Sequence, residues 1–179
     1  SLDGVIVATP PALHADMAVA ALAAGRHVLV EKPMTLALAD AQRVDDASRR
    51  HGRIVCVGHT HLFSTAFRTL REAAGGLGAL REIRSAAGNW GPCRRDASVL
   101  WDWAPHHLAM CLELAGGEPR TLQARQLATA ALPDGSGEAI EIVLGFAGAA
   151  EATIRVSNID RAKSRRFEAR HEFGTLVYD

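Results

Sequence analysis

The chain has 179 residues, 48% of them hydrophobic, which is enough for one large domain or two small domains with packed cores. Its 20 basic residues balance its 20 acidic residues, so no overall charge attracts nucleic acid or an anionic membrane. No apolar run approaches the roughly 20 residues of a membrane span, and we therefore expect neither a nucleic-acid partner nor a membrane partner.

The first part of the chain, residues 5–30, is predicted to form a strand, a helix and a second strand. An unbroken apolar run at residues 5–8 is typical of a strand that helices cover on both faces. From residue 12 the apolar residues recur at helical spacing, and Gly25 suits the end of that helix. Residues 28–30 form a second apolar run. The apolar positions of the predicted helix are Leu13, Met17, Ala20, Ala21 and Ala24.

A polar group follows each of these two strands. The first group is Thr9, Pro10 and Pro11, and the second is Glu31, Lys32 and Pro33. Two strands joined by one helix pair in parallel with a right-handed crossover, and open parallel sheets bind ligands beyond the carboxyl ends of their strands. We therefore expect the chemistry of the protein at these two groups.

These features together resemble a known family. The segment VATPPALHADMAVAALAAGRHVLVEKPM carries a Thr-Pro turn, His14, one helix, one strand and Glu-Lys-Pro in that order. It is similar to the later part of the nucleotide-binding domain of the Gfo/Idh/MocA family, NAD(P)-dependent oxidoreductases that act mostly on sugars and cyclitols. The resemblance implies that NAD or NADP is bound by Thr9, Pro10, Pro11, His14, Glu31, Lys32 and Pro33.

The resemblance also implies that part of the nucleotide-binding domain lies outside this chain. No GxGxxG phosphate loop opens a helix anywhere in the sequence. The glycine-rich loop and the acidic residue that distinguishes NAD from NADP are then expected upstream of Ser1, and further strands after Asp179. We expect these residues alone to bind dinucleotide poorly.

Two more helices and a third parallel strand, residues 54–58, complete the first predicted domain. Thr35 is a candidate cap for a helix that ends at Gly52, with inward positions Leu38, Ala41, Val44 and Ala47. A third helix, with Phe67 and Leu70, ends near Gly76, where the pattern changes to that of antiparallel strands. We place a partial dinucleotide-binding (Rossmann) domain at residues 1–76 and a partial α+β domain at residues 77–179.

The second domain is predicted to be an open, mainly antiparallel sheet with helices on one face. Its predicted strands are residues 80–90, 121–128, 138–146, 151–157, 166–172 and 175–178. Pro105 suits the first turn of a helix that stops at Gly116, and residues 161–166 look like a basic hairpin turn. Because an open sheet leaves one face exposed, and the family commonly pairs through it, we expect a homo-oligomer.

Asp102 and His106 resemble the second motif of the family, which supplies the catalytic histidine from the substrate domain. Residues four apart on a helix share one face. The resemblance implies that His106 removes the hydroxyl proton of a ring alcohol while a hydride passes to the nicotinamide. Asp102 then orients the imidazole, and Lys32 donates a hydrogen bond to the same oxygen. Family members differ in whether the lysine or the histidine is the base, so both remain candidates.

The expected substrate site consists of Lys32, Trp90, Asp102, His106 and His107. Trp90 lies where the cleft between the domains is expected, and His107 stands where family members often carry an acidic residue. Each histidine can instead be a structural residue of the core or of a helix end, and Lys32 can be a solvated lysine.

Three further side-chain groups have uncertain roles. His59 and His61 can form half a metal site, but without a nearby carboxylate pair or cysteine we predict no metal, and instead a backbone or cofactor contact at the strand end. Arg94 and Arg95 are predicted to be solvated loop charges, or else to contact an anionic group, because residues 91–107 are similar to family members that oxidise nucleotide-linked sugars. The cysteines, Cys56, Cys93 and Cys111, are widely spaced, which suits thiols in the cytoplasm.

Three functions therefore stay open. The first is a dehydrogenase acting on a sugar, cyclitol or nucleotide sugar. The second is a glycoside hydrolase or lyase that uses NAD for transient oxidation, and the third is a non-catalytic NAD(P)-binding regulator. Retention of Lys32 with Asp102 and His106 favours the first, because a pure binder needs no base beside the nicotinamide.

Overall fold

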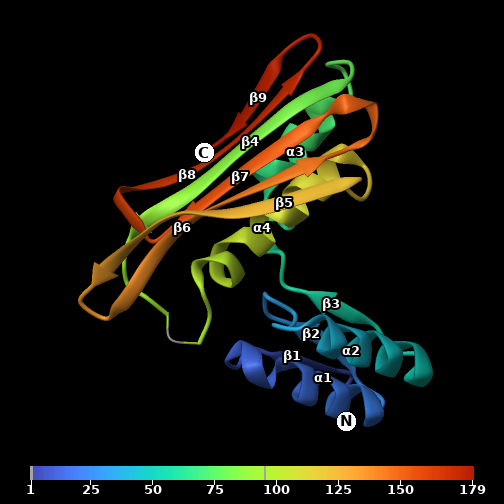
Figure 1. Cartoon of the computed structure of the whole chain (residues 1–179). Helices are drawn as coiled ribbons and strands as arrows, with labels where there is room; N and C mark the ends of the chain where they lie inside the picture. The colour runs from blue at the N-terminus through green and yellow to red at the C-terminus, as the bar shows by residue number, and fades with distance from the viewer. Residues whose placement is uncertain (1, 95) are drawn as a thin grey trace. The chain divides into compact units, whose positions relative to one another are not determined.

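The computed structural model describes residues 2–94 and 96–179 (Figure 1). The contacts divide the chain into two compact units, Ser1–His59 and Thr60–Asp179. The division precedes helix α3 (Thr65–Ala74), whereas the expected boundary at residue 76 followed it. The reason is that Phe67 and Leu70 of α3 are buried in the core of the second unit.

The first unit is a three-stranded parallel sheet in the order β1-β2-β3. Its strands are β1 (Gly4–Val7), β2 (His27–Val30) and β3 (Val55–Val57). Val7 pairs with Val30, which in turn pairs with Val57, so the three carboxyl ends are level. The parallel sheet expected from the sequence is therefore present, and the polar groups that follow its strands begin at one edge.

Helices α1 (His14–Ala23) and α2 (Leu38–His51) connect these strands. Because the two helices pack on each other, they lie on the same face of the sheet. On the opposite face Ile6 is 70% exposed and Ile54 is 66% exposed, with no helix over them among the described residues. The prediction that helices cover both faces of these strands is therefore wrong for residues 2–59.

The buried face of α1 also differs from the predicted one. A short 3₁₀ turn, η1 (Pro11–Leu13), precedes this helix. The buried residues are His14, Ala15, Ala18 and Leu22, while Leu13 and Met17 of the predicted face are more than two-fifths exposed. Alanine and other apolar residues occupy almost every position of α1, so apolar spacing alone does not select one face.

Helix α2 ends as expected but begins differently. Gly52 caps its C-terminus in the left-handed conformation, with φ of 59°. Its N-cap is Ala37, not Thr35, whose buried hydroxyl instead donates to the Ala37 carbonyl at 2.9 Å. Val44 and Ala47 are buried as predicted, but Leu38 is 75% exposed because a three-residue period drifts away from the 3.6-residue helical turn.

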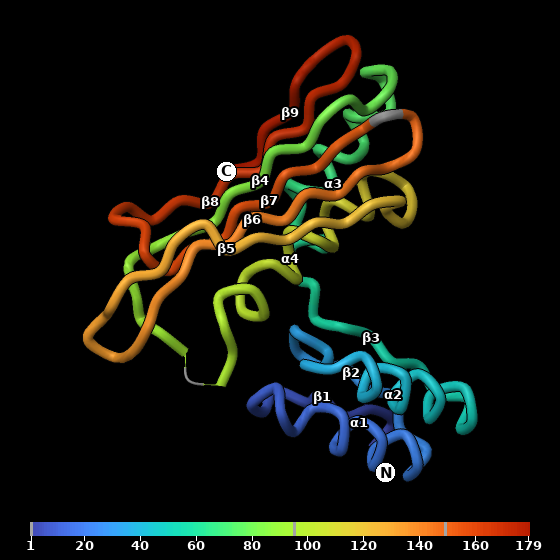
Figure 2. Tube along the Cα trace, in the orientation of Figure 1, coloured from blue at the N-terminus to red at the C-terminus, as the bar shows by residue number. Residues whose placement is uncertain are grey.

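The second unit is a six-stranded sheet in the order β5-β6-β7-β4-β8-β9 (Figure 2). Its strands are β4 (Leu80–Trp90), β5 (Thr121–Leu132), β6 (Gly135–Gly145), β7 (Glu151–Ser157), β8 (Ile159–His171) and β9 (Thr175–Tyr178). Every neighbouring pair is antiparallel except β4 and β7. Helices α3 and α4 (Val99–Ala115) cover one face, which confirms the predicted α+β architecture.

Two predicted boundaries in this unit are wrong. Helix α4 begins at Val99, where the Ser98 carbonyl accepts from the Asp102 amide at 3.0 Å, so Pro105 lies inside the helix and not in its first turn. Residues 161–166 are not a hairpin turn, because β8 continues through them and pairs with β4.

Among the described residues, no helix is long and apolar enough to cross a membrane.

Candidate active site

The loops that carry the predicted cofactor residues start side by side at the carboxyl edge of the parallel sheet. The Glu31 amide donates to the Val7 carbonyl at 2.9 Å, and the Gly58 amide donates to the Val30 carbonyl at 2.8 Å. Each bond extends the strand pairing one residue beyond the strand end. The loops after β1, β2 and β3 therefore leave the sheet together, at the edge where parallel sheets bind ligands.

His14 joins two of these loops. Its side chain is 1% exposed, with Nδ1 2.8 Å from the Pro33 carbonyl and Nε2 2.8 Å from the Thr9 carbonyl. Carbonyl oxygens only accept, so a neutral imidazole donates to one of them and an imidazolium to both. The buried ring thus supports the backbone of both loops from beneath, which is a less direct role than the cofactor contact expected for it.

Lys32 and Glu31 occupy the loop after β2. The Lys32 amide donates to the Glu31 carboxylate at 3.3 Å, and the Lys32–Pro33 peptide bond is cis. The same carboxylate lies over Gly58, where an added Cβ would be 3.4 Å from Glu31 Oε2. Pro33 is buried and Lys32 is half-buried.

A buried hydroxyl at this edge fits a polar ligand. Thr9 Oγ1 is buried and has no hydrogen-bond partner among the described residues, although buried hydroxyls in proteins are nearly always paired. At the end of β3, burial lowers the pKa of His59. The edge therefore presents an unsatisfied hydroxyl and an imidazole that favours its neutral form, which suits the hydroxyl, amide and phosphate groups of a dinucleotide.

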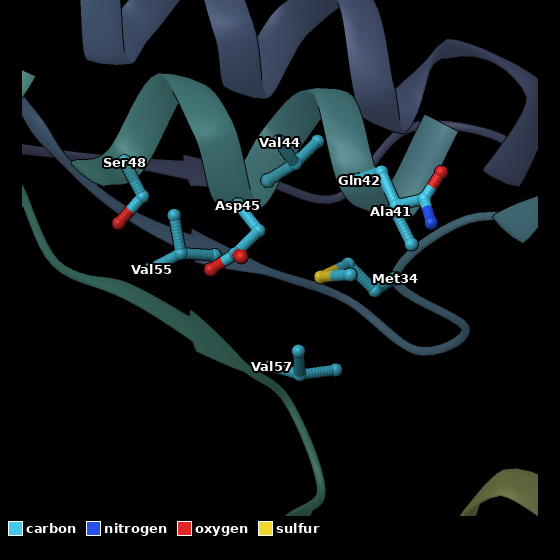
Figure 3. A pocket seen from close by; sticks show the side chains of 8 residues that line it. All are labelled: Met34, Ala41, Gln42, Val44, Asp45, Ser48, Val55 and Val57. Carbon is cyan, nitrogen blue, oxygen red and sulfur yellow. The ribbon is translucent and has the colours of Figure 1, made fainter. Parts of the chain in front are cut away.

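A groove elsewhere on the first unit contains none of the predicted site residues (Figure 3). It lies between α2 and β3, and its lining residues are Met34, Ala41, Gln42, Val44, Asp45, Ser48, Val55 and Val57. Its lining is largely apolar, and Met34 alone comes from the loop after β2, so we assign no role to it.

In the second unit, His106 of α4 lies against His61 of a short 3₁₀ turn, η2 (Thr60–Phe63). The two ring centroids are 4.7 Å apart, with an angle of 63° between the planes. His61 Nδ1 lies 3.0 Å from the hydroxyl of Tyr178, the last residue of β9. Sequence reasoning found His106, but it missed Tyr178, and it considered His61 as half of a metal site or as a backbone or cofactor contact, not as a neighbour of His106.

His107 is held by a residue that sequence reasoning missed. Its Nδ1 lies 2.5 Å from the hydroxyl of Ser85 on β4. Burial, and then the charges of His61 and Arg165, lower the pKa of His107 to about 4. His107 is therefore a neutral hydrogen-bonding group at neutral pH. The alternation of Ile83, Ser85 and Ala87 already puts the Ser85 hydroxyl on the inward face of its strand, and that was the available signal.

Asp102 lies on α4 one turn before His106, as predicted, and it also pairs with Arg94 at 3.0 Å. Arg94 forms two further bonds with Asp96, at 3.0 and 2.6 Å, and these carboxylates raise its pKa. Arg94 is thus an ion-paired residue and not the solvated charge that we expected. Arg95 lies outside the described residues.

Trp90 ends β4 and is 54% exposed, so its ring is accessible for contact.

Within residues 2–94 and 96–179, no group of three or more histidine, cysteine, aspartate or glutamate side chains can hold a metal ion. His59 and His61, the proposed half of such a site, fall in different units.

Both units match models of one protein family. Residues 1–59 match an oxidoreductase family with an NAD-binding Rossmann fold, and residues 67–177 match the Gfo/Idh/MocA C-terminal domain, which is more than half of the chain. The chain belongs to the Gfo/Idh/MocA family of oxidoreductases. The first match ends at the residue where the contacts divide the chain.

Several proteins that are similar to this Gfo/Idh/MocA chain are named as dehydrogenases or oxidoreductases. Over 71 residues it is 41% identical to 1-carboxy-3-chloro-3,4-dihydroxycyclohexa-1,5-diene dehydrogenase of Comamonas testosteroni. This match covers 40% of the chain and 18% of that protein. The crystal structure of an oxidoreductase from Magnetospirillum magnetotacticum superimposes with a TM-score of 0.93 and 41% identity, over 98% of the chain and 57% of that structure. The structure of UDP-N-acetylglucosamine 3-dehydrogenase of Acidithiobacillus ferrooxidans superimposes with a TM-score of 0.86 and 27% identity. The match covers 99% of the chain and 57% of that structure.

The Gfo/Idh/MocA chain thus spans little more than half of the length of these structures and less than a fifth of the first relative. Within that span it carries two separate groups of polar side chains. The loops around Thr9 and Lys32 lie at the edge where the Rossmann fold binds NAD, and the histidines of α4 lie in the C-terminal domain.

Proposed function

We propose that the complete protein is a dehydrogenase that transfers a hydride from a ring secondary alcohol of a sugar, cyclitol or nucleotide sugar to NAD or NADP. The observation that carries this proposal is the group of side chains around His106. Side chains of η2, β4, β9 and α4 contact one another in this group. One of these side chains, His107, is kept in its neutral form by burial. Such a group can accept a proton and hold a hydroxyl, which is what alcohol oxidation requires of the protein.

In this proposal each residue of the chain has a defined task. His106 accepts the proton of the substrate hydroxyl, and Lys32 donates a hydrogen bond to the same oxygen as negative charge develops on it. Asp102 and His107 position the imidazole and the substrate. His14 holds the Thr9 and Pro33 loops together. When bound, the nicotinamide supplies the hydride acceptor.

Nucleotide sugars are the part of the substrate class with the least support from the site. A basic loop before α4 would suit a phosphate, but Arg94 in that loop is already paired with Asp96 and Asp102. The support that remains is the similarity to the UDP-N-acetylglucosamine 3-dehydrogenase. We therefore place uncharged sugars and cyclitols first in a substrate screen.

We also propose a homo-oligomer that forms through the open face of the six-stranded sheet, and a cytoplasmic location. The oligomer is supported by the second face of that sheet, which no helix covers in the part of the chain that the structure describes. The cytoplasmic location is supported by Cys56, Cys93 and Cys111, which are all free thiols, as is usual in a reducing compartment.

The test is to measure NADH or NADPH formation by the complete gene product with a panel of inositols, hexoses and UDP-sugars. We expect turnover with at least one ring alcohol. His106→Gln should lower kcat by about 100- to 10,000-fold, the usual contribution of a proton-transfer group. Lys32→Ala should lower kcat by about 100- to 1,000-fold, the usual cost of removing a donor to a developing oxyanion, while the Kd of the cofactor is retained. Arg50→Ala serves as the control, because Arg50 is an exposed residue of the last turn of α2 and has no role in either group.

Other outcomes would select the other functions. Glycoside cleavage without net NADH formation would indicate transient oxidation. Tight NAD binding with no turnover on any substrate, and no effect of the His106 substitution on any measured property, would indicate a regulator. Wild-type turnover by His106→Gln would contradict the roles proposed above.

A further inference from the structure

A line of aromatic rings connects the core of the second unit to His106. Phe167 of β8 packs edge-on against Phe67 of α3 with centroids 6.0 Å apart, and Phe67 packs against Tyr178 of β9 at 6.3 Å. Tyr178 then packs against His61 at 6.0 Å, and His61 against His106 at 4.7 Å. Every contact has the T-shaped geometry that aromatic pairs prefer.

The inner end of this line is rigidly anchored. Phe67 and Phe167 are each 1% exposed, in the core formed by the sheet and its two helices. Tyr178 pairs with Phe167 in the register between β8 and β9, which sets the position of its ring along the strand. A side chain that contacts this line therefore has little freedom to move relative to the sheet.

The outer end of the line carries a hydrogen bond that packing alone does not require. A phenylalanine at position 178 would fill the same apolar space, but only tyrosine places a hydroxyl 3.0 Å from His61 Nδ1. A phenol hydroxyl can donate to or accept from a ring nitrogen, and in either direction the hydrogen bond orients the histidine ring. The Tyr178 hydroxyl thus fixes the imidazole that lies against His106.

We infer that Tyr178 and His61 are positioning residues for His106: the Tyr178 hydroxyl fixes the His61 ring, and the edge-on His61 ring fixes the orientation of the His106 imidazole. This inference rests on the proposed function, in which His106 accepts the substrate proton. A base must point its nitrogen at the reacting proton, and small errors of position are costly for turnover.

The test uses Tyr178→Phe, which keeps the ring and removes only the hydroxyl. Tyr178 is the only tyrosine in the sequence, so the change removes a single phenol. Leu176→Ala is the matched control, because Leu176 packs on the same core from the same strand and is not part of the aromatic line. It weakens the packing of β9 and leaves the hydroxyl in place.

The first readout needs no activity. With ¹⁵N-labelled histidine in the 179-residue chain, we expect His61 Nδ1 to give the shift of a hydrogen-bonded nitrogen in the wild type and in Leu176→Ala. In Tyr178→Phe we expect this shift to change, because the hydroxyl 3.0 Å from Nδ1 is removed. Unchanged His61 shifts in Tyr178→Phe would overturn the inference.

The second readout is kinetic and uses the complete gene product. We expect Tyr178→Phe to lower kcat by about tenfold, less than the roughly hundredfold cost of a 1 Å misplacement, with the KM of the cofactor unchanged. Leu176→Ala should retain kcat. If His106→Gln is inactive while Tyr178→Phe keeps full kcat, the positioning role is overturned. If His106→Gln is itself fully active, the proposed function fails, and the ¹⁵N shifts of His61 still report separately on the hydrogen bond.

Discussion

At the scale of single residues, His107 shows how burial changes the chemistry of a side chain. Its pKa falls to about 4 from the ordinary value of 6.5, first through burial and then through the charges of His61 and Arg165. A difference of this size corresponds to about 3 kcal/mol between the two protonation states. Ser85 supplies the hydrogen bond that the neutral ring needs in the protein interior.

This lowered pKa predicts a specific dependence of stability on pH. The unfolded chain binds a proton at His107 below about pH 6.5, whereas the folded chain does so only below about pH 4. The free energy of unfolding should therefore be highest above pH 6.5 and fall as the pH is lowered through this window. In His107→Asn, which cannot titrate, the fall should be smaller by up to about 3 kcal/mol.

Urea denaturation at a series of pH values between 4 and 7.5 measures this difference. His51→Asn is the control, because His51 is an exposed histidine at the end of α2. Equal pH dependence in His107→Asn and the wild type would show that His107 is not held neutral by the fold.

The residues of the candidate site differ in how far the sequence predicts them. Lys32, Asp102 and His106 stand in short motifs, so their chain neighbours identify them. Tyr178 and His61 are 117 positions apart, and only the packing of β9 against α3 brings them together. No local pattern encodes such a pair, which is why sequence reasoning missed it.

At the scale of elements, β4 is the central strand on which the second unit depends. It pairs with β7 in parallel and with β8 in antiparallel fashion. Beside it, Asp160 accepts from Arg155 at 2.5 and 2.7 Å and from Ser157 at 2.9 Å. The Asp160 carboxylate lies so close to Gly88 that a Cβ at that position would overlap it.

We therefore predict that Gly88→Ala destabilises the protein. The new methyl group would displace Asp160 from Arg155 and Ser157, and overpacking of this kind costs about 1 to 3 kcal/mol. Gly117→Ala is the matched control, because a Cβ at Gly117 would meet no atom within 4 Å. Urea denaturation of both variants measures the difference, and equal stability of the two would contradict the close approach of Asp160 to β4.

The elements also show which sequence rules succeed. Alternation of inward and outward residues predicts the strands well, and β4, β7 and β9 have the expected bounds, because each strand has one face on the core. The rule that proline occupies a first helical turn failed for Pro105, because α4 starts at Val99 and the burial of Ala104, Met110 and Cys111 holds the helix around the proline. At Pro105, tertiary packing therefore outweighs the local preference of proline for the first helical turn.

At the scale of the whole molecule, the open face of the six-stranded sheet is the surface on which proposed self-association depends. Arg125, Glu141 and Arg155 stand opposite one another on β5, β6 and β7, and Arg125 pairs with Glu141 at 2.6 Å. Glu141 also contributes to the raised pKa of Arg155, after the larger contribution of Asp160. The face therefore carries a row of alternating charge, where the sequence predicted only an exposed sheet.

A charged row makes the predicted oligomer sensitive to salt and to charge reversal. Arginine is common in protein interfaces. Salt screens exposed charges, and at 1 M salt their interaction is weak beyond about 3 Å. We expect the complete gene product to form an oligomer at low ionic strength. Arg125→Glu should dissociate it, because a glutamate would repel Glu141 of the same row and leave the row acidic.

Sedimentation velocity of the wild type and of Arg125→Glu measures this directly, with Arg49→Glu as the control because Arg49 lies on α2 of the first unit. Dissociation by Arg125→Glu but not by Arg49→Glu is the expected result, since only the first substitution changes the charge of the open sheet. If both variants keep the sedimentation coefficient of the wild type, subunits must associate through another surface. The alternating charges would then serve only to hold neighbouring strands together, where exposed ion pairs contribute little.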